Sequence, residues 1–251
     1  MKAGQIALVT GAATGIGKAC AIHLARAGYR VMLNYRSREQ EAQAMLKQLA
    51  GEGHQALAAD VSDPAQASRL LQQIDRDQGR LDVLVNAAGI FANQDIVAGD
   101  FEAWQASWQQ VMQTNLMGPV NLAFAAAKLM IPQGSGKIIN ITSRGAFRGE
   151  PTAPAYGASK SALNSASQSL AVALAPHGIQ VYAIAPGWVD TPMAAPRIFG
   201  ANQAAILADI PLGRPGHVDE IAGLATYLAS GETAYLTGAI IDANGASYLR
   251  N

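Results

Sequence analysis

The stretch "APAYGASKSALN" (153–164) places a phenol and an ammonium group four residues apart, at Tyr156 and Lys160. Residues with this spacing share one face of an α-helix and can interact. A nearby positive charge favours the ionised form of a phenol, whose free pKa of about 10 is too high for efficient proton exchange near neutral pH. The spacing therefore predicts a proton-transfer pair. The small residues between the two also suit close packing of this helix against a neighbour.

A glycine-rich turn follows the first apolar run of the chain. In "TGAATGIG" (10–17) the glycines stand at positions 11, 15 and 17, and a helix-like segment follows directly. Glycines permit a tight turn and let the backbone approach a pyrophosphate at a helix N-terminus, where unpaired N–H groups and the helix dipole favour an anion. The turn predicts a dinucleotide site, and an ordinary strand-to-helix turn is the alternative interpretation. The candidate cofactor-binding residues here are Gly11, Thr14, Gly15, Ile16 and Gly17.

The end of the second apolar run, "NYRSRE" (34–39), bears on the choice of nucleotide. Sites that select NAD usually carry an acid here for the ribose hydroxyls, whereas sites that select NADP carry an arginine near the 2′-phosphate. Tyr35 occupies the place of the acid, and Arg36 and Ser37 follow it. The pattern favours NADP(H) and leaves NAD(H) possible. The alternative interpretation is an exposed turn with ordinary surface arginines.

Two later stretches also follow apolar runs. "AADVSD" contains Asp60 and Val61, which could flank an adenine edge, and "NAAG" offers small residues across which a cofactor could lie flat. The carboxyl edge of an open parallel sheet is the expected position of a ligand. The candidates in the second stretch are Asn86, Ala87, Ala88 and Gly89.

Short apolar runs and amphipathic stretches alternate along the whole chain. Runs rich in Val, Ile and Leu predict strands at 5–10, 30–35, 54–60, 81–87, 136–142, 178–185 and 238–243. Helix-like segments lie at 15–27, 38–51, 64–78, 101–130, 155–176 and 217–230. This alternation predicts a single α/β domain over 1–251, with a doubly wound (Rossmann) parallel sheet of about seven strands and helices on both faces. The segment at about 190–212, rich in proline and glycine, predicts a substrate lid.

Composition argues against several other classes of protein. Half of the 251 residues are hydrophobic and 14% are charged, so a large core is available. The formal net charge of zero lacks the electrostatic footprint of a nucleic-acid or anionic-membrane binder, and we expect neither as a partner. The four histidines are far apart and Cys20 is the single cysteine, so no metal site is predicted. The apolar run near the N-terminus is too short for a signal peptide or membrane span, which favours a soluble cytoplasmic protein.

Six motifs in this order resemble the short-chain dehydrogenase/reductase family. They are T-G-x-x-x-G-I-G, N-A-A-G, the Asn115 of "MQTNLMG", a serine thirteen residues before the tyrosine, Y-x-x-x-K and "PGWVDT" (186–191). The resemblance covers essentially the whole chain, and it departs from the commoner family pattern only where Ala87 replaces a second asparagine. It implies a catalytic tetrad of Asn115, Ser143, Tyr156 and Lys160. It also implies cofactor contacts from Tyr156, Lys160, Pro186, Gly187, Val189 and Thr191.

The resemblance assigns a role to each member of the tetrad. Tyr156 would exchange the proton, Ser143 would hold the substrate oxygen, Lys160 would hold the nicotinamide ribose, and Asn115 would position a water molecule in a proton relay. The expected activity is NADP(H)-dependent hydride transfer between nicotinamide and a small-molecule carbonyl or secondary alcohol. The chain looks most like the 3-oxoacyl-carrier-protein reductase branch, which favours ketone reduction.

Two alternatives stay open. "VMLNYRSRE" also resembles the matching stretch of bacterial glucose dehydrogenases, which suggests a sugar or polyol dehydrogenase. A dinucleotide-sensing or scaffold protein without turnover would keep the same fold, but the intact tetrad argues against it. Arg144 and Arg148 lie near Ser143 and could meet an anionic substrate or carrier, or lie at the surface. The resemblance further implies a homotetramer built on the helices at 101–130 and 155–176.

Overall fold

A computed structural model describes residues 4–250 of the chain, so the two ends of the expected domain, 1–3 and 251, lie outside the described range. Within that range one sheet of seven parallel strands has the order β3-β2-β1-β4-β5-β6-β7. The strands are β1 (Ile6–Val9), β2 (Arg30–Tyr35), β3 (Gln55–Ala58), β4 (Val83–Asn86), β5 (Gly136–Ile141), β6 (Ile179–Pro186) and β7 (Ile240–Ala243). The predicted doubly wound parallel sheet is confirmed, with the order reversing between β1 and β4.

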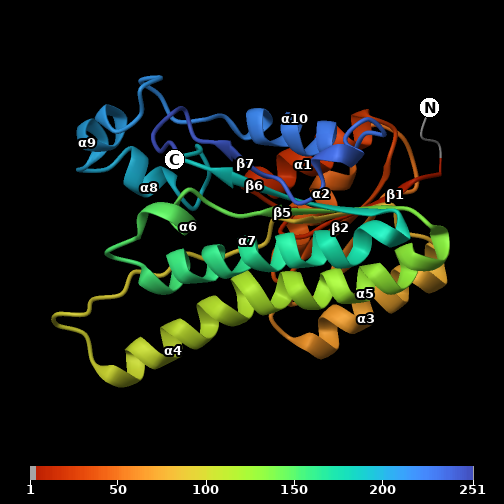
Figure 1. Cartoon of the computed structure of the whole chain (residues 1–251), viewed down its shortest axis with the longest axis horizontal. Coiled ribbons are helices and arrows are strands. Elements are labelled where there is room, and N and C mark those ends of the chain that lie inside the picture. The colour runs from red at the N-terminus through yellow and green to blue at the C-terminus, as the bar shows by residue number, and fades with distance from the viewer. Residues whose placement is uncertain (1–3, 251) are drawn as a thin grey trace.

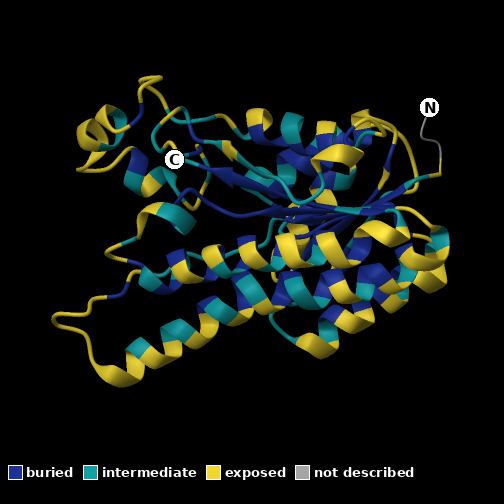
Figure 2. Ribbon diagram, in the orientation of Figure 1, coloured by how far each residue is buried: buried dark blue, intermediate teal, exposed yellow. Residues whose placement is uncertain are grey.

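Helices cover both faces of this sheet (Figure 1). One face carries α1 (Gly15–Arg26), α2 (Glu39–Leu46) and α10 (Val218–Ala229). The other face carries α3 (Pro64–Gln78), α4 (Phe101–Met112), α5 (Gly118–Gln133) and α7 (Pro154–Leu174). The central strands are buried between these layers, whereas the outward faces of the helices are exposed (Figure 2). Strands that are apolar on both sides, such as "IALV" in β1, are the sequence signature of this sandwich.

Local signals place the boundaries of α3 where the sequence predicts them, whereas the helix expected at 38–51 ends early, at Leu46. The Asp63 carboxylate accepts hydrogen bonds from the backbone N–H groups of Ala65 and Gln66, and Pro64 occupies the first turn of α3. The helix ends at Gly79, whose φ of 65° is left-handed. A capping side chain, a proline at the start and a glycine after the end are each favourable there.

Two predicted segments contain more structure than the sequence indicated. The expected helix at 101–130 is divided between α4 and α5 by a π-helical turn, η1 (Gln113–Met117). The expected lid contains two short helices, α8 (Ala195–Ile198) and α9 (Gln203–Ala208). A further short helix, α6 (Gly145–Arg148), follows β5. Proline and glycine obscure the helical periodicity in the lid, and one π turn leaves no mark in a hydrophobic pattern.

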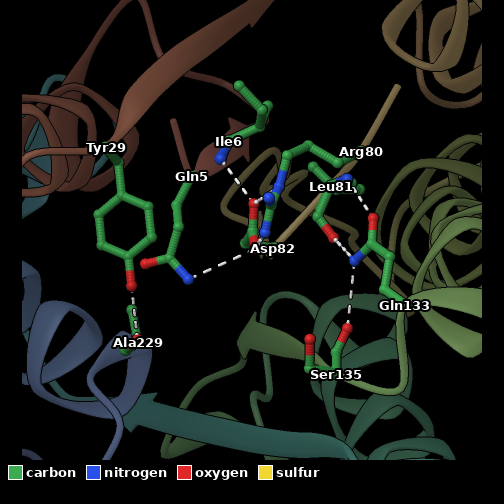
Figure 3. Close-up of polar contacts among 9 residues, drawn as sticks. All are labelled: Gln5, Ile6, Tyr29, Arg80, Leu81, Asp82, Gln133, Ser135 and Ala229. Carbon is green, nitrogen blue, oxygen red and sulfur yellow. Dashed lines mark hydrogen bonds and ion pairs between the residues drawn. The ribbon is translucent and has the colours of Figure 1, made fainter. Parts of the chain in front are cut away.

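Polar side chains tie the strand starts together at the amino edge of the sheet (Figure 3). The nearly buried Asp82 carboxylate accepts hydrogen bonds from the Ile6 backbone N–H at 2.8 Å and from Arg80 Nε at 2.9 Å and Nη2 at 2.6 Å. The Gln133 side chain bonds both backbone groups of Leu81, accepting from N–H at 2.9 Å and donating to the carbonyl at 2.8 Å. These contacts hold the starts of β1 and β4 against the end of α5.

No helix in the described part of the chain is both long enough and apolar enough to cross a membrane.

Candidate active site

A cavity opens at the carboxyl edge of the sheet, where β1, β4, β5 and β6 end. Many of the predicted site residues line it together, although they come from five separate stretches of the sequence. They are Gly11, Thr14, Gly15, Ile16, Gly17, Ala87, Ala88, Gly89, Ser143, Tyr156, Lys160, Pro186, Gly187, Val189 and Thr191. The predicted residues absent from its lining are Tyr35, Arg36, Ser37, Asp60, Val61, Asn86 and Asn115.

The glycine turn forms one wall of the cavity. Gly11 has a φ of 63°, and a Cβ atom there would lie 2.9 Å from the Ala88 Cα atom. A Cβ atom on Gly17 would overlap the carbonyl oxygen of Gly11. Thr14 is the N-cap of α1 but makes no side-chain capping bond, so the first N–H groups of this helix face the cavity without a side-chain acceptor. Such a helix start suits an anionic group such as a pyrophosphate.

A buried threonine connects this turn to the "NAAG" stretch. Thr10 Oγ1 accepts hydrogen bonds from the backbone N–H groups of Ala87 at 3.0 Å and Ala88 at 3.1 Å. Asn86 instead points into the core, where its Nδ2 donates to Asn140 Oδ1 at 2.8 Å. The Asn86 side chain therefore braces β4 against β5, and the backbone of the next residues forms the cavity wall.

The residues predicted to choose the nucleotide gather beside the cavity, at the ends of β2 and β3. Tyr35 is largely buried, whereas the Arg36 side chain is 56% exposed. Arg36 Nη1 lies 3.9 Å from Asp60 Oδ2, and Asp60 Oδ1 accepts hydrogen bonds from the Ser62 N–H and hydroxyl. The loose ion pair leaves the guanidinium available to a further anion.

Ser143, Tyr156 and Lys160 meet in the cavity because β5 ends beside the first turns of α7. The Lys160 ammonium donates a hydrogen bond to the Ile141 carbonyl at 2.9 Å and lies 5.8 Å from the centre of the Tyr156 ring. Ser143 Oγ accepts a hydrogen bond from the Gly145 N–H at 3.0 Å. The Ser143 hydroxyl and the Lys160 ammonium are thus held by backbone contacts.

Asn115 lies behind these residues, on the π turn η1. Its Oδ1 accepts a hydrogen bond from the Ile90 N–H at 2.8 Å, and its Nδ2 donates to the Ile90 carbonyl at 2.9 Å and to Ser159 Oγ at 3.2 Å. A Cβ atom built on Gly89 would lie 3.4 Å from Asn115 Oδ1 and 3.6 Å from Lys160 Nζ. The asparagine therefore lies close to Lys160 but is fully buried and outside the cavity lining.

Burial controls the electrostatics of the Tyr156–Lys160 pair. It raises the pKa of the Tyr156 phenol, and the hydrogen bond with Ser143 opposes this increase. Burial lowers the pKa of Lys160 to about 8. The predicted effect of the ammonium on the phenol is therefore outweighed here by desolvation, because the charged form of either group loses water.

Four further side chains that the sequence did not single out line the cavity: Phe91, Glu150, Trp188 and Arg197. Burial raises the pKa of the Glu150 carboxyl, and nearby arginines oppose this shift. Trp188 lies inside the "PGWVDT" motif, and Arg197 lies inside the substrate lid predicted at 190–212.

The structure separates the two arginines that follow Ser143. Arg144 is 6% exposed, lines the cavity and lies 3.1 Å from Asp209 Oδ2. Arg148 lies 2.7 Å from the same oxygen but outside the lining. Among the described residues no group of three or more His, Cys, Asp or Glu side chains could hold a metal ion.

Comparison with known proteins agrees with this geometry. A family model described as enoyl-(acyl carrier protein) reductase matches residues 11–245. The 3-oxoacyl-[acyl-carrier-protein] reductase of Synechocystis sp. is 37% identical over 244 residues, covering 96% of each chain. The corresponding FabG reductase of Escherichia coli is 37% identical over 246 residues, covering 98% of each chain.

A solved structure shows the same fold over nearly the whole length. YwfH, described as an NADPH-dependent reductase involved in bacilysin biosynthesis, superposes with a TM-score of 0.88 at 29% sequence identity, covering 98% of this chain and 99% of YwfH. The matched family model, the full-length relatives and the shared fold lead to one assignment. The chain belongs to the short-chain dehydrogenase/reductase family and is an oxidoreductase of that family.

Proposed function

We propose that the protein is an NADP(H)-dependent reductase that converts a ketone of the 3-oxoacyl type into a secondary alcohol. The single observation that carries this proposal is the convergence of Ser143, Tyr156 and Lys160 beside the glycine turn, in one cavity. The names of the relatives support the same reaction, since those proteins are described as 3-oxoacyl reductases and as an NADPH-dependent reductase.

The residues present fit a dinucleotide. The start of α1 lacks a side-chain cap, and a Cβ atom at Gly11 would overlap the backbone of Ala88, so glycine is required at this point of the turn. The glycine turn would hold the pyrophosphate, and Lys160 would hold the nicotinamide ribose. When bound, the cofactor supplies the hydride that adds to the carbonyl carbon. As that bond forms, the carbonyl π electrons move onto the oxygen, which then needs a proton.

The chain's own residues manage this proton. Ser143 would donate a hydrogen bond to the substrate oxygen and orient it. Tyr156 would transfer its phenolic proton to the same oxygen, leaving a phenolate. Burial opposes that phenolate, and the Lys160 ammonium beside the ring reduces the cost of forming it. Asn115, held by hydrogen bonds to Ile90 and Ser159, would position a water molecule in a proton relay that returns a proton to Tyr156.

A panel of ketones and secondary alcohols, assayed with both cofactors, tests the reaction. We expect turnover of 3-oxo compounds with NADPH, whether they are supplied as free acids, esters or thioesters. A clear preference for sugars or polyols would replace this proposal with a polyol dehydrogenase. Tight cofactor binding with no turnover of any substrate would support a sensing or scaffold protein.

We also propose that four copies of the chain assemble into a homotetramer. The helices α5 and α7 lie side by side on one face of the sheet (Figure 1), and large apolar side chains are exposed on both. Phe124 on α5 is 64% exposed and Val172 on α7 is 79% exposed. Light scattering should give four times the mass of the chain, and a monomer at micromolar concentration would reject the assembly.

The segment 190–212 is proposed as a lid over the substrate. Residues from Thr191 to Arg197 contribute to the cavity lining, and the short helices α8 and α9 follow. Its amide hydrogens should exchange more slowly when cofactor and substrate are bound. Equal exchange in both states would contradict this role.

A further inference from the structure

We propose that Arg197 is a specificity residue that binds a carboxylate carried by the ketone substrate itself. The inference rests on the proposed ketone reduction and narrows its substrate class to free oxo acids. In a carrier-bound or esterified acyl chain the corresponding carboxyl group is an uncharged thioester or ester, which offers no anion to a guanidinium.

A series of aromatic contacts places Arg197 next to the reaction centre. Its Cζ atom lies 3.5 Å from the centre of the Phe91 ring and 5.5 Å from the centre of a Trp188 ring. The Phe91 ring in turn lies 5.0 Å from the Tyr156 ring. All four side chains line the same cavity. A single aromatic ring therefore separates the guanidinium from the phenol that would protonate the substrate oxygen.

The stacking fixes the guanidinium but leaves its hydrogen-bonding edge available. Contacts with aromatic faces use the planes of the group, whereas its N–H donors point outward in the plane. Within residues 4–250 no carboxylate lies within ion-pair distance of Arg197, and its one recorded hydrogen bond is from Nη2 to the Met193 carbonyl at 3.4 Å. A planar fork of donors is the geometry that binds a carboxylate through two parallel hydrogen bonds.

The other charged groups of the cavity are already engaged or balanced. Arg144 pairs with Asp209, and Lys160 donates to the Ile141 carbonyl. Glu150 is the one acid in the lining, against Arg144, Lys160 and Arg197, and it interacts electrostatically with the two arginines. The lining therefore has an excess of positive charge, and of its two arginines only Arg144 has a described carboxylate within ion-pair distance. An anionic substrate would supply one to Arg197.

The position of Arg197 also limits the size of the substrate. The guanidinium is on α8, across one ring from the catalytic phenol, so the anion must lie only a few bonds from the carbonyl group. A phosphate could satisfy the same charge. We commit to the carboxylate because its planar, two-oxygen shape matches the donor fork of a guanidinium.

The test compares charged and neutral forms of the same ketone. The kcat/KM values of 3-oxo, 4-oxo and 5-oxo carboxylates and of their methyl esters are measured with NADPH for wild type, Arg197→Met and Arg197→Lys. Dihydroxyacetone phosphate is included as a ketone that carries a phosphate instead of a carboxylate. Arg214→Met is the matched control, because Arg214 lies outside this cavity and pairs with Glu220.

At least one carboxylate should exceed its ester in the wild type. Arg197→Met should lower kcat/KM for that acid by about ten- to hundredfold, as expected for one charge-assisted contact, and change the ester by less than about threefold. Arg197→Lys should keep part of the preference, and Arg214→Met all of it. An equal loss for acid and ester, a wild-type preference for every ester, or an Arg197-dependent preference for the phosphate would each overturn the inference.

Failure of the proposed reaction gives a different result. If no ketone is reduced, the affinity of the same carboxylates is measured by calorimetry with NADPH present. Tighter binding to wild type than to Arg197→Met would keep the anion site and reject the reaction, and equal affinity would reject the site.

Discussion

At the amino edge of the sheet the Asp82 carboxylate accepts hydrogen bonds from Ile6 and Arg80, whereas at the carboxyl edge the guanidinium of Arg197 lies over an aromatic ring with no described carboxylate within ion-pair distance. Both are polar groups at the ends of strands or in the loops beyond them. The first set is satisfied within the protein and stabilises it. Arg197, Tyr156 and Lys160 at the carboxyl edge are held by contacts that leave them able to bind a ligand or exchange a proton. Substitutions at the two edges should therefore separate stability from turnover.

The largest effect is expected at the carboxyl edge, from Tyr156→Phe. Loss of the phenolic proton should lower kcat by roughly 10²–10⁴-fold, while cofactor binding and the unfolding temperature stay close to wild type. Steady-state kinetics and a cofactor titration measure the two quantities. The control is Tyr29→Phe, which removes a hydroxyl that donates to the Ala229 carbonyl at 2.6 Å far from the cavity and should reduce stability but not kcat. Turnover of Tyr156→Phe within tenfold of wild type would contradict the role.

The pH dependence of the unfolding free energy should show how much the buried Lys160 charge destabilises the folded protein. Burial lowers the pKa of Lys160 to about 8 in the folded protein, against about 10.5 when unfolded, so the unfolded chain binds more protons between these values. The free energy of unfolding should therefore rise with pH between about 8 and 10.5, by up to about 3 kcal/mol, and this increment should be missing in Lys160→Met. Denaturant titrations of both proteins across this range provide the comparison, and parallel pH profiles would argue against it.

A substitution at the amino edge of the sheet should lower stability and leave turnover unchanged. Asp82→Ala removes the acceptor for the Ile6 N–H and for Arg80, at a site that is 7% exposed. We expect a loss of about 2–3 kcal/mol in unfolding free energy, at the lower end for a broken buried pair because Arg80 is partly exposed. The kcat of the remaining folded protein should be unchanged. A fall in kcat as large as that of a cavity variant would remove the distinction between the two edges.

The smallest effect concerns the nucleotide. The 2′-phosphate of NADPH should gain one charge-assisted contact from Arg36, worth about 1.5–3 kcal/mol, so kcat/KM should favour NADPH over NADH by roughly ten- to a hundredfold. Thr14 stands where a second basic residue in the glycine turn could have enlarged this ratio. Replacing Tyr35 by Asp together with Arg36 by Ser should invert the preference. Equal efficiency of the wild type with both cofactors would contradict the prediction.

Much of the fold follows from local patterns. Runs such as "RVMLNY" and "GKIINI" form strands within a residue or two of their expected ends, because both faces of each strand are covered. The shared cavity position of Tyr156 and Lys160 likewise follows from a spacing of four on one helix. These features depend on neighbours in sequence, which is why they could be predicted.

The features that could not be predicted depend on tertiary contacts. Phe91, Trp188 and Arg197 come from three loops or short helices, and no spacing in the sequence relates them. The inward direction of Asn86 depends on a partner, Asn140, on the neighbouring strand. Burial reversed the expected direction of the Tyr156 pKa, since desolvation is a property of the folded environment and not of residue type.

The π turn at Gln113–Met117 has a consequence for how this chain tolerates changes in length. A π turn holds more residues than the 3.6 of an α-helical turn, so this segment contains in effect one residue more than a continuous α-helix would need. Deleting a single residue there would restore a regular α-helix and leave α4 and α5 in nearly the same rotational relation. The turn that carries Asn115 would be lost, and with it the hydrogen bonds that Asn115 forms with the Ile90 backbone. Surface loops can absorb insertions and deletions, whereas at this turn the number of residues matters as much as their types.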